Sequence, residues 1–72
     1  MPDAPVKRSV TVSGHRTSVS LEQEFWTELA GIARAEELSL NELVTSIDRD
    51  RRGGLSSAIR VHVLTYLHEK TR

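Results

Sequence analysis

Within HRTSVSL, residues 15–21, polar side chains alternate with apolar or β-branched ones from Arg16 to Leu21. Side chains of an extended strand change face at every step, so Arg16, Ser18 and Ser20 share one face. An arginine can donate two hydrogen bonds to the edge of a guanine, and serine hydroxyls can donate to or accept from several bases. The stretch therefore has the chemistry of a base-contacting surface, provided that the fold exposes this face and buries the opposite one.

The chain that must position this strand is short, with 72 residues and no cysteine. A single hydrophobic core is barely sufficient at this length, and no disulfide or thiolate metal site can brace it. Small domains of this kind usually bury further surface against a partner subunit, so we expect a homodimer. A chain without cysteine fits a reducing cytoplasm, and no apolar run approaches the ~20 residues of a membrane span. We therefore expect a cytoplasmic protein without a membrane partner.

The formal net charge is zero, but charge is distributed unevenly along the chain. Residues 1–20 and 53–72 are each net basic, whereas residues 21–37 hold five glutamates and one arginine. A neutral total weakly disfavours nucleic acid as a partner, since that binding is driven by cations facing phosphate. The basic N-terminal arm is nevertheless compatible with nucleic-acid binding, and Lys7 and Arg8 are the candidate phosphate contacts in this arm.

The apolar pattern changes phase near Gly14. Val10 and Val12 alternate in SVTVSG, but one continuous strand would put them on the face of Arg16. A break or bulge at Gly14 would reset the phase, and so would a two-residue Ser13-Gly14 hairpin turn.

In the hairpin alternative Val10 lies opposite Thr17, which restores one apolar face. We favour a break, because Asn-Gly or Asp-Gly is the stronger hairpin signal. The chain is then divided into an N-terminal arm, residues 1–13, which carries an extra strand in the hairpin alternative, and a main domain, residues 14–72.

Three helices are expected after the strand, each with polar residues typical of a helix start. The expected caps are Ser20 with Gln23, Ser39 with Glu42, and Ser56 or Ser57. The first helix should end near Glu36, and Gly53-Gly54 should close the second. Val61 and Leu64 widen the apolar surface of the third helix, which indicates contacts on two sides, one within the subunit and one across a dimer.

A lone strand cannot hold itself in water, but it can pair with its copy in a second chain across a two-fold axis. Such pairing would bury one face of the strand among the helices of both subunits and expose a doubled row of polar side chains. A two-stranded ribbon has a width that the major groove of DNA admits. The expected dimer core consists of strand and helix positions, namely Thr17, Val19, Leu21, Phe25, Leu29, Leu43 and Ile47.

The order of HRTSVSL, the helix EQEFWTELAGIA, the turn ELS and the helix SLNELVTSI resembles the ribbon-helix-helix family, to which the methionine and Arc repressors belong. The resemblance covers roughly residues 15–51, and LSSAIRVHVLTYLHEK is similar to the closing helix of many members. It implies a mostly α fold, with one N-terminal strand and two to three helices. Members are intertwined homodimers that insert an antiparallel ribbon into the major groove.

Carried over to this chain, the resemblance implies a sequence-specific, repressor-like DNA-binding regulator. Arg16, Ser18 and Ser20 match the base-contacting positions of the family. Ser39, Leu40 and Asn41 match its phosphate clamp, in which backbone amides at a helix N-terminus hold a phosphate. The extra helix-sized segment leaves Ser56-Ser57 as the alternative head of the clamping helix.

Two other function classes compete with DNA binding. A small dimeric protein-binding module, such as an antitoxin or a co-regulator, is favoured by the neutral total charge and the acidic first helix. An enzyme is not expected, because His62 and His68 lack the i, i+4 spacing of helical metal ligands and no phosphate loop or nucleophile elbow is present. No metal or cofactor is expected either.

Overall fold

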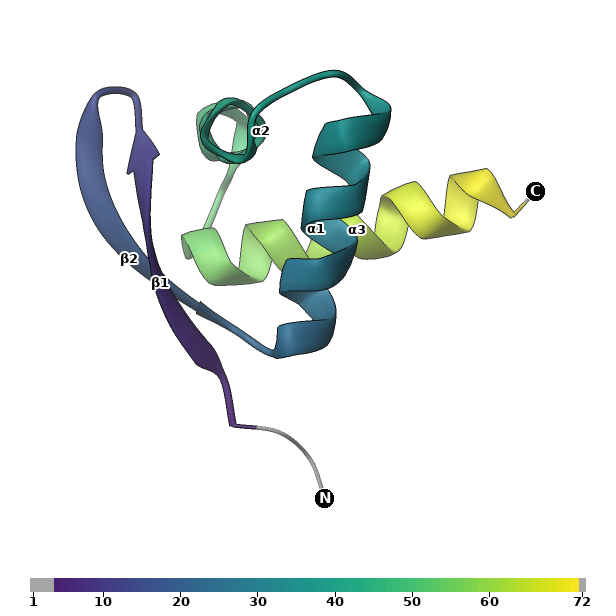
Figure 1. Cartoon of the computed structure of the whole chain (residues 1–72), viewed down its shortest axis with the longest axis horizontal. Coiled ribbons are helices and arrows are strands. Elements are labelled where there is room, and N and C mark those ends of the chain that lie inside the picture. The colour runs from purple at the N-terminus through teal and green to yellow at the C-terminus, as the bar shows by residue number, and fades with distance from the viewer. Residues whose placement is uncertain (1–3, 72) are drawn as a thin grey trace.

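The structure is a computed structural model that describes residues 4–71. It contains a two-stranded antiparallel sheet and three helices. In chain order the elements are β1 (Val6–Val12), β2 (His15–Leu21), α1 (Gln23–Ala35), α2 (Leu40–Asp50) and α3 (Leu55–Lys70). Figure 1 shows the two strands on one side of the molecule and the three helices on the other. One face of the sheet is therefore covered by helices, and the other is open.

The break that the sequence favoured at Gly14 is wrong, because β1 and β2 form a hairpin. Ser13 and Gly14 have φ values of 51° and 83°, and the two-residue type I′ turn requires positive φ at both central positions. The register places Val10 opposite Thr17. The turn therefore puts the apolar residues of both strands on one face of the sheet, which accounts for the change of phase at Gly14.

Ser13 is the strained position of this turn, since an L-residue other than asparagine or aspartate rarely adopts positive φ. Replacing Ser13 with asparagine should stabilise the fold by about 0.5–1 kcal/mol, because Asn-Gly is the preferred pair for a type I′ turn. Urea denaturation followed by circular dichroism measures this difference. An unchanged or lower midpoint would contradict the turn described here.

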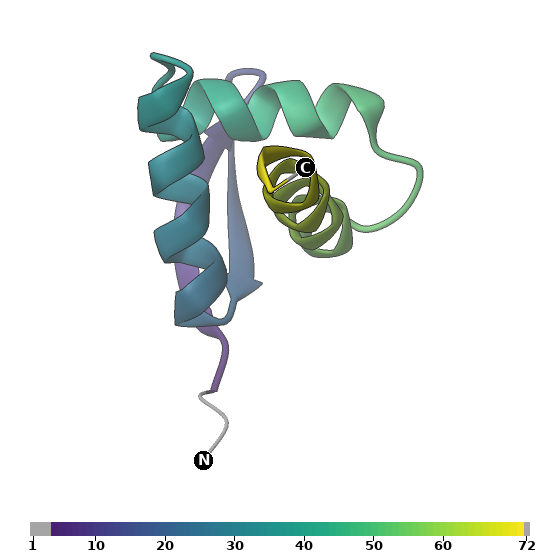
Figure 2. The same cartoon turned by 90° about the vertical axis from the view of Figure 1, so that its right-hand side faces the viewer.

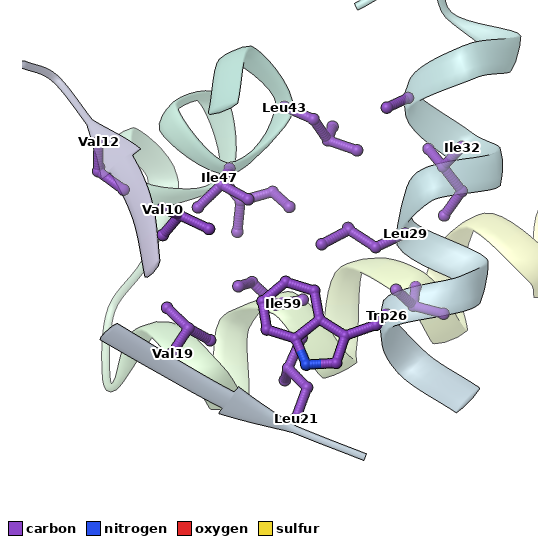
Figure 3. Packing of buried hydrophobic residues seen from close by; sticks show 13 residues of the cluster. Val10, Val12, Val19, Leu21, Trp26, Leu29, Ile32, Leu43, Ile47 and Ile59 are labelled. Carbon is purple, nitrogen blue, oxygen red and sulfur yellow. The ribbon is translucent and has the colours of Figure 1, made fainter. Parts of the chain in front are cut away.

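The hydrophobic core lies between the hairpin and the helices, as Figure 3 shows. β1 contributes Val10 and Val12, so its residues belong to the folded core. Trp26 is 4% exposed, and its Nε1 donates a hydrogen bond to the carbonyl oxygen of Val6 at 2.9 Å. Trp26 thus packs in the core and ties α1 to the start of β1. The buried residues are Val10, Val12, Val19, Leu21, Trp26, Leu29, Ile32, Ala33, Leu43, Val44, Ile47, Ile59 and Val63.

The start of α1 differs from the prediction. Ser20 remains in β2 and does not cap the helix. The N-cap is Glu22, and it makes no side-chain capping hydrogen bond. The end of α1 is as predicted, with Glu36 as the C-cap residue.

The capping box at the start of α2 is confirmed. Ser39 Oγ accepts from the Glu42 amide at 3.0 Å, and the Ser39 amide donates to Glu42 Oε1 at 2.7 Å. The predicted end at Gly53-Gly54 is wrong, because the backbone is already extended at Arg51. Gly54 is instead the N-cap of α3, which begins at Leu55.

Candidate nucleic-acid interface

The outer face of the hairpin carries the three residues that the sequence singled out for base contacts. Arg16, Ser18 and Ser20 are exposed, and the inward-facing Val19 and Leu21 between and beside them are buried. The register adds the outward residues of β1, with Thr11 opposite Arg16, Ser9 opposite Ser18 and Lys7 opposite Ser20. Residues 6–21 contain no aspartate or glutamate. The hairpin therefore presents a polar, basic face of six side chains.

The outer edge of β2 is open in this chain. Pairs in an antiparallel sheet alternate between hydrogen-bonded and non-hydrogen-bonded positions, and a two-residue turn makes Val12 and His15 a hydrogen-bonded pair. By this alternation the amides of Arg16, Ser18 and Ser20 point away from β1. None of the described residues accepts a hydrogen bond from them. β2 thus offers a row of free backbone donors and acceptors, as an edge strand does.

The outer edge of β1 is covered by α2 at the end next to the turn. The Thr11 amide donates to Asn41 Oδ1 at 3.0 Å, and the Ser13 amide donates to Thr45 Oγ1 at 3.3 Å. Within residues 4–71, the edge of β2 is therefore free along its length, whereas the edge of β1 is partly occupied. Asn41, expected in the phosphate clamp, uses its side-chain oxygen within the fold.

Two further candidates lie on the inner face of the hairpin. Arg8 pairs opposite Val19, and its guanidinium carbon lies 5.6 Å from the centre of the Trp26 ring, within cation–π range. It therefore points to the side opposite Lys7, although the sequence grouped the two as phosphate contacts. Thr17, expected in the dimer core, is exposed although its neighbours Val19 and Val10 are buried.

The other expected dimer-core residues are found in the core of a single chain. Val19, Leu21, Leu29, Leu43 and Ile47 are buried, and Phe25 is half-buried. The break favoured at Gly14 left β1 out of this core, whereas the hairpin alternative drawn from the phase reset at Ser13-Gly14 placed β1 beside β2, as observed.

The two candidate starts for a phosphate clamp differ in what already occupies them. At the start of α2, the Ser39 hydroxyl and the Ser39 amide are both used in the capping box, and the carboxylate of Glu42 lies there. The start of α3 has no side-chain cap and no acidic residue in its first turn. In Figure 1, α3 begins beside the hairpin and runs away from it, so its positive dipole end lies near the sheet.

One ion pair joins α3 to the junction between β2 and α1. Arg60 Nε donates to Glu22 Oε1 at 3.0 Å and Arg60 Nη2 donates to Glu22 Oε2 at 3.3 Å. This hydrogen bonding from Arg60 holds the pKa of the Glu22 carboxyl below its ordinary value of 4.5. The pair fixes α3 against the point where β2 leads into α1.

The described residues include no group of three or more side chains placed to hold a metal ion. None of the helices in residues 4–71 has the length and apolar character needed to cross a lipid bilayer.

Comparison with known families identifies a match over most of the chain. The family model described as a ribbon-helix-helix domain matches residues 5–67, a span that includes both strands and most of α3. The chain belongs to the ribbon-helix-helix family. Domains of this family are typically DNA-binding regulators or antitoxins, and the family's proteins form dimers. No curated protein and no solved structure gives a significant match.

Proposed function

We propose that this protein is a homodimeric, sequence-specific DNA-binding transcriptional regulator with a repressor-like action. The observation that carries the proposal is the carboxylate-free outer face of the hairpin, on which Arg16, Ser18 and Ser20 are exposed together. The hairpin contains no aspartate or glutamate, whereas α1 carries Glu24 and Glu28 on its exposed side. Selection of bound duplexes from a random pool, at a defined salt concentration, tests it. Failure to enrich any sequence would contradict sequence-specific binding.

The dimer is proposed to form along the free edge of β2. Two copies of β2 can pair antiparallel about Ser18, which puts Arg16 of one strand opposite Ser20 of the other. No like charges then face each other directly. The paired strands form a ribbon whose outer face doubles the row of Arg16, Ser18 and Ser20, and a ribbon of two strands fits the major groove.

The apolar surface of α3 supports the same dimer. Val61 and Leu64 are each 59% exposed, on the face of α3 that points away from the core. Figure 2 shows α1 on the β1 side of the hairpin and α3 on the β2 side. An association along the β2 edge therefore also brings a second copy toward α3, where these two side chains can be buried.

The phosphate clamp is proposed at the start of α3. The amides of its first turn are not used by a side-chain cap, and the helix dipole favours an anion there. Ser56 and Ser57 add hydroxyl donors to the same turn. The hydroxyl and amide of Ser39 and the side-chain oxygen of Asn41 are engaged within the fold, so at the α2 start the backbone amides of Leu40 and Asn41 keep the role that the resemblance gave them.

Replacing Ser57 with glutamate should separate DNA binding from stability. The new carboxylate lies in the first turn of α3, where it stabilises the helix dipole but repels a phosphate. We expect an unchanged or higher midpoint of thermal unfolding together with DNA affinity reduced at least about tenfold, because two clamps per dimer are lost. Circular dichroism and fluorescence anisotropy with a labelled duplex measure the two quantities.

The matched control is Thr65→Glu, which adds the same charge on the exposed side of α3 about two turns further along. That distance, about 12 Å, exceeds the Debye length at physiological salt, so its effect on DNA binding should be small. If both variants lose the same amount of DNA affinity, the effect comes from net charge, and the phosphate clamp does not lie at the start of α3.

A second candidate function is binding of another protein, as an antitoxin or a co-regulator does. The observation that favours it is a surface groove of about 190 Å³ between α1 and α3, with apolar walls and two glutamates on its rim. Its lining residues are Glu24, Phe25, Glu28, Val63, Leu64 and Leu67. Such a groove suits a basic amphipathic segment. If no duplex binds even at low salt, protein binding becomes the function to pursue.

A further inference from the structure

β1 adds a second polar row beside the row on β2. Its outward side chains are Lys7, Ser9 and Thr11, of which Lys7 and Ser9 are exposed and Thr11 is half-buried. All three can donate hydrogen bonds, and Lys7 carries a positive charge. They lie on the face that carries Arg16, so any ligand that meets one row lies close to the other.

β1 is held rigidly in this place. Val10 and Val12 are buried in the core at 3% and 7% exposure, the Thr11 amide donates to Asn41 of α2, and Trp26 of α1 donates to the carbonyl oxygen of Val6. The polar row on β1 is therefore part of the folded surface, at a fixed distance from the row on β2.

The width of the resulting sheet decides where β1 can lie on DNA. Pairing along the β2 edge gives the strand order β1-β2-β2-β1, with neighbouring strands about 4.8 Å apart. The two outer strands are then about 14 Å apart, whereas the major groove is about 12 Å wide. Only the central pair can enter the groove, and the two copies of β1 must lie over its walls, where the phosphates are.

We infer that β1 is a phosphate-contacting rim, in which Lys7 pairs with a phosphate and the hydroxyls of Ser9 and Thr11 donate to phosphate oxygens on each side of the groove. The inference rests on the proposed function, because it needs the β2 ribbon in the groove. The rim would add sequence-independent phosphate contacts by β1 to the base contacts made by β2, because phosphates are the same at every base pair.

The test is a salt series on duplex binding by the full-length protein, for the natural chain, Lys7→Ala and Lys70→Ala. Each lysine that contacts a phosphate contributes about 0.9 to the slope of log K against log salt. Lys7→Ala should therefore lower the slope by about 1.8 for the dimer and leave the preferred sequence unchanged. Lys70→Ala, which removes the same charge at the far end of α3 (Figure 1), should leave the slope unchanged.

A second variant, Ser9→Glu, places a carboxylate at an exposed position of β1, in the same row of side chains as Lys7. It should weaken binding to every duplex by at least about tenfold, with the fold retained by circular dichroism. If the natural chain binds DNA but Lys7→Ala leaves the salt slope unchanged or alters the preferred sequence, the phosphate-contacting rim is contradicted and the proposed function is not. Failure of the natural chain to bind any duplex overturns the proposed function, and the rim with it.

Discussion

Replacing Ser18 with proline is expected to give a folded monomer that no longer binds DNA. The amide of Ser18 points to the free edge of β2, and Ser18 and Ser9 form a non-hydrogen-bonded pair within the hairpin. Proline therefore removes no bond of the hairpin, and its ring blocks the edge along which a second copy would pair. Sedimentation velocity measures the oligomeric state, circular dichroism the fold, and fluorescence anisotropy the binding of a duplex.

The matched control is Ser9→Pro, at the position directly opposite on β1. Its amide points to the outer edge of the sheet, which the proposed dimer does not use, so the oligomeric state should not change. A Ser18→Pro chain that still sediments as a dimer would place the dimer interface elsewhere. A dimer lost equally in both variants would indicate a general effect of proline on the hairpin.

The faces of the strand could be predicted from the sequence, but its neighbour could not. Alternation with a period of two is a local property, so the exposure of Arg16, Ser18 and Ser20 and the burial of Val19 and Leu21 follow from residue types alone. The turn depends on positive φ at Ser13, which residue type does not favour. The packing of Val10 and Val12 against the helices stabilises a turn that its own residues only weakly specify.

Caps and long-range contacts show the same difference. The Ser39–Glu42 capping box spans three residues and could be predicted from them. The hydrogen bond from the Thr11 amide to Asn41 joins residues 30 positions apart, and no local pattern indicates it. The placement of Arg8 over Trp26 likewise follows from the hairpin register, which the sequence left open.

The choice between the two clamp positions also depends on tertiary structure. Both Ser39 and Ser56-Ser57 have residue types found at helix starts. What separates them is the direction of α3, which begins at the hairpin, and the occupation of the Ser39 groups by Glu42. Neither property can be derived from the sequence before the helices are placed against the sheet.

Replacing Arg16 with alanine is expected to remove most of the sequence preference in DNA binding. Arg16 is the one arginine on the outer face of the hairpin, and the dimer would present two copies of it to the groove. Loss of a bidentate guanine contact costs about 1–3 kcal/mol, or about 5- to 150-fold in affinity per half-site. Binding to unrelated duplexes should fall much less, because phosphate contacts remain. Random-pool selection and anisotropy titrations on preferred and unrelated duplexes measure the two effects.

Arg34→Ala is the matched control, since it removes an exposed arginine from α1, on the helical side of the molecule. Both variants change the net charge equally, so a difference between them isolates the position of Arg16. If Arg16→Ala weakens binding to all duplexes by the same factor, Arg16 contacts phosphate, and base recognition must depend on Ser18 and Ser20. If its sequence preference is unchanged and its affinity matches that of Arg34→Ala, the outer face of the hairpin does not meet the bases, and the ribbon proposed here is not the surface that binds DNA.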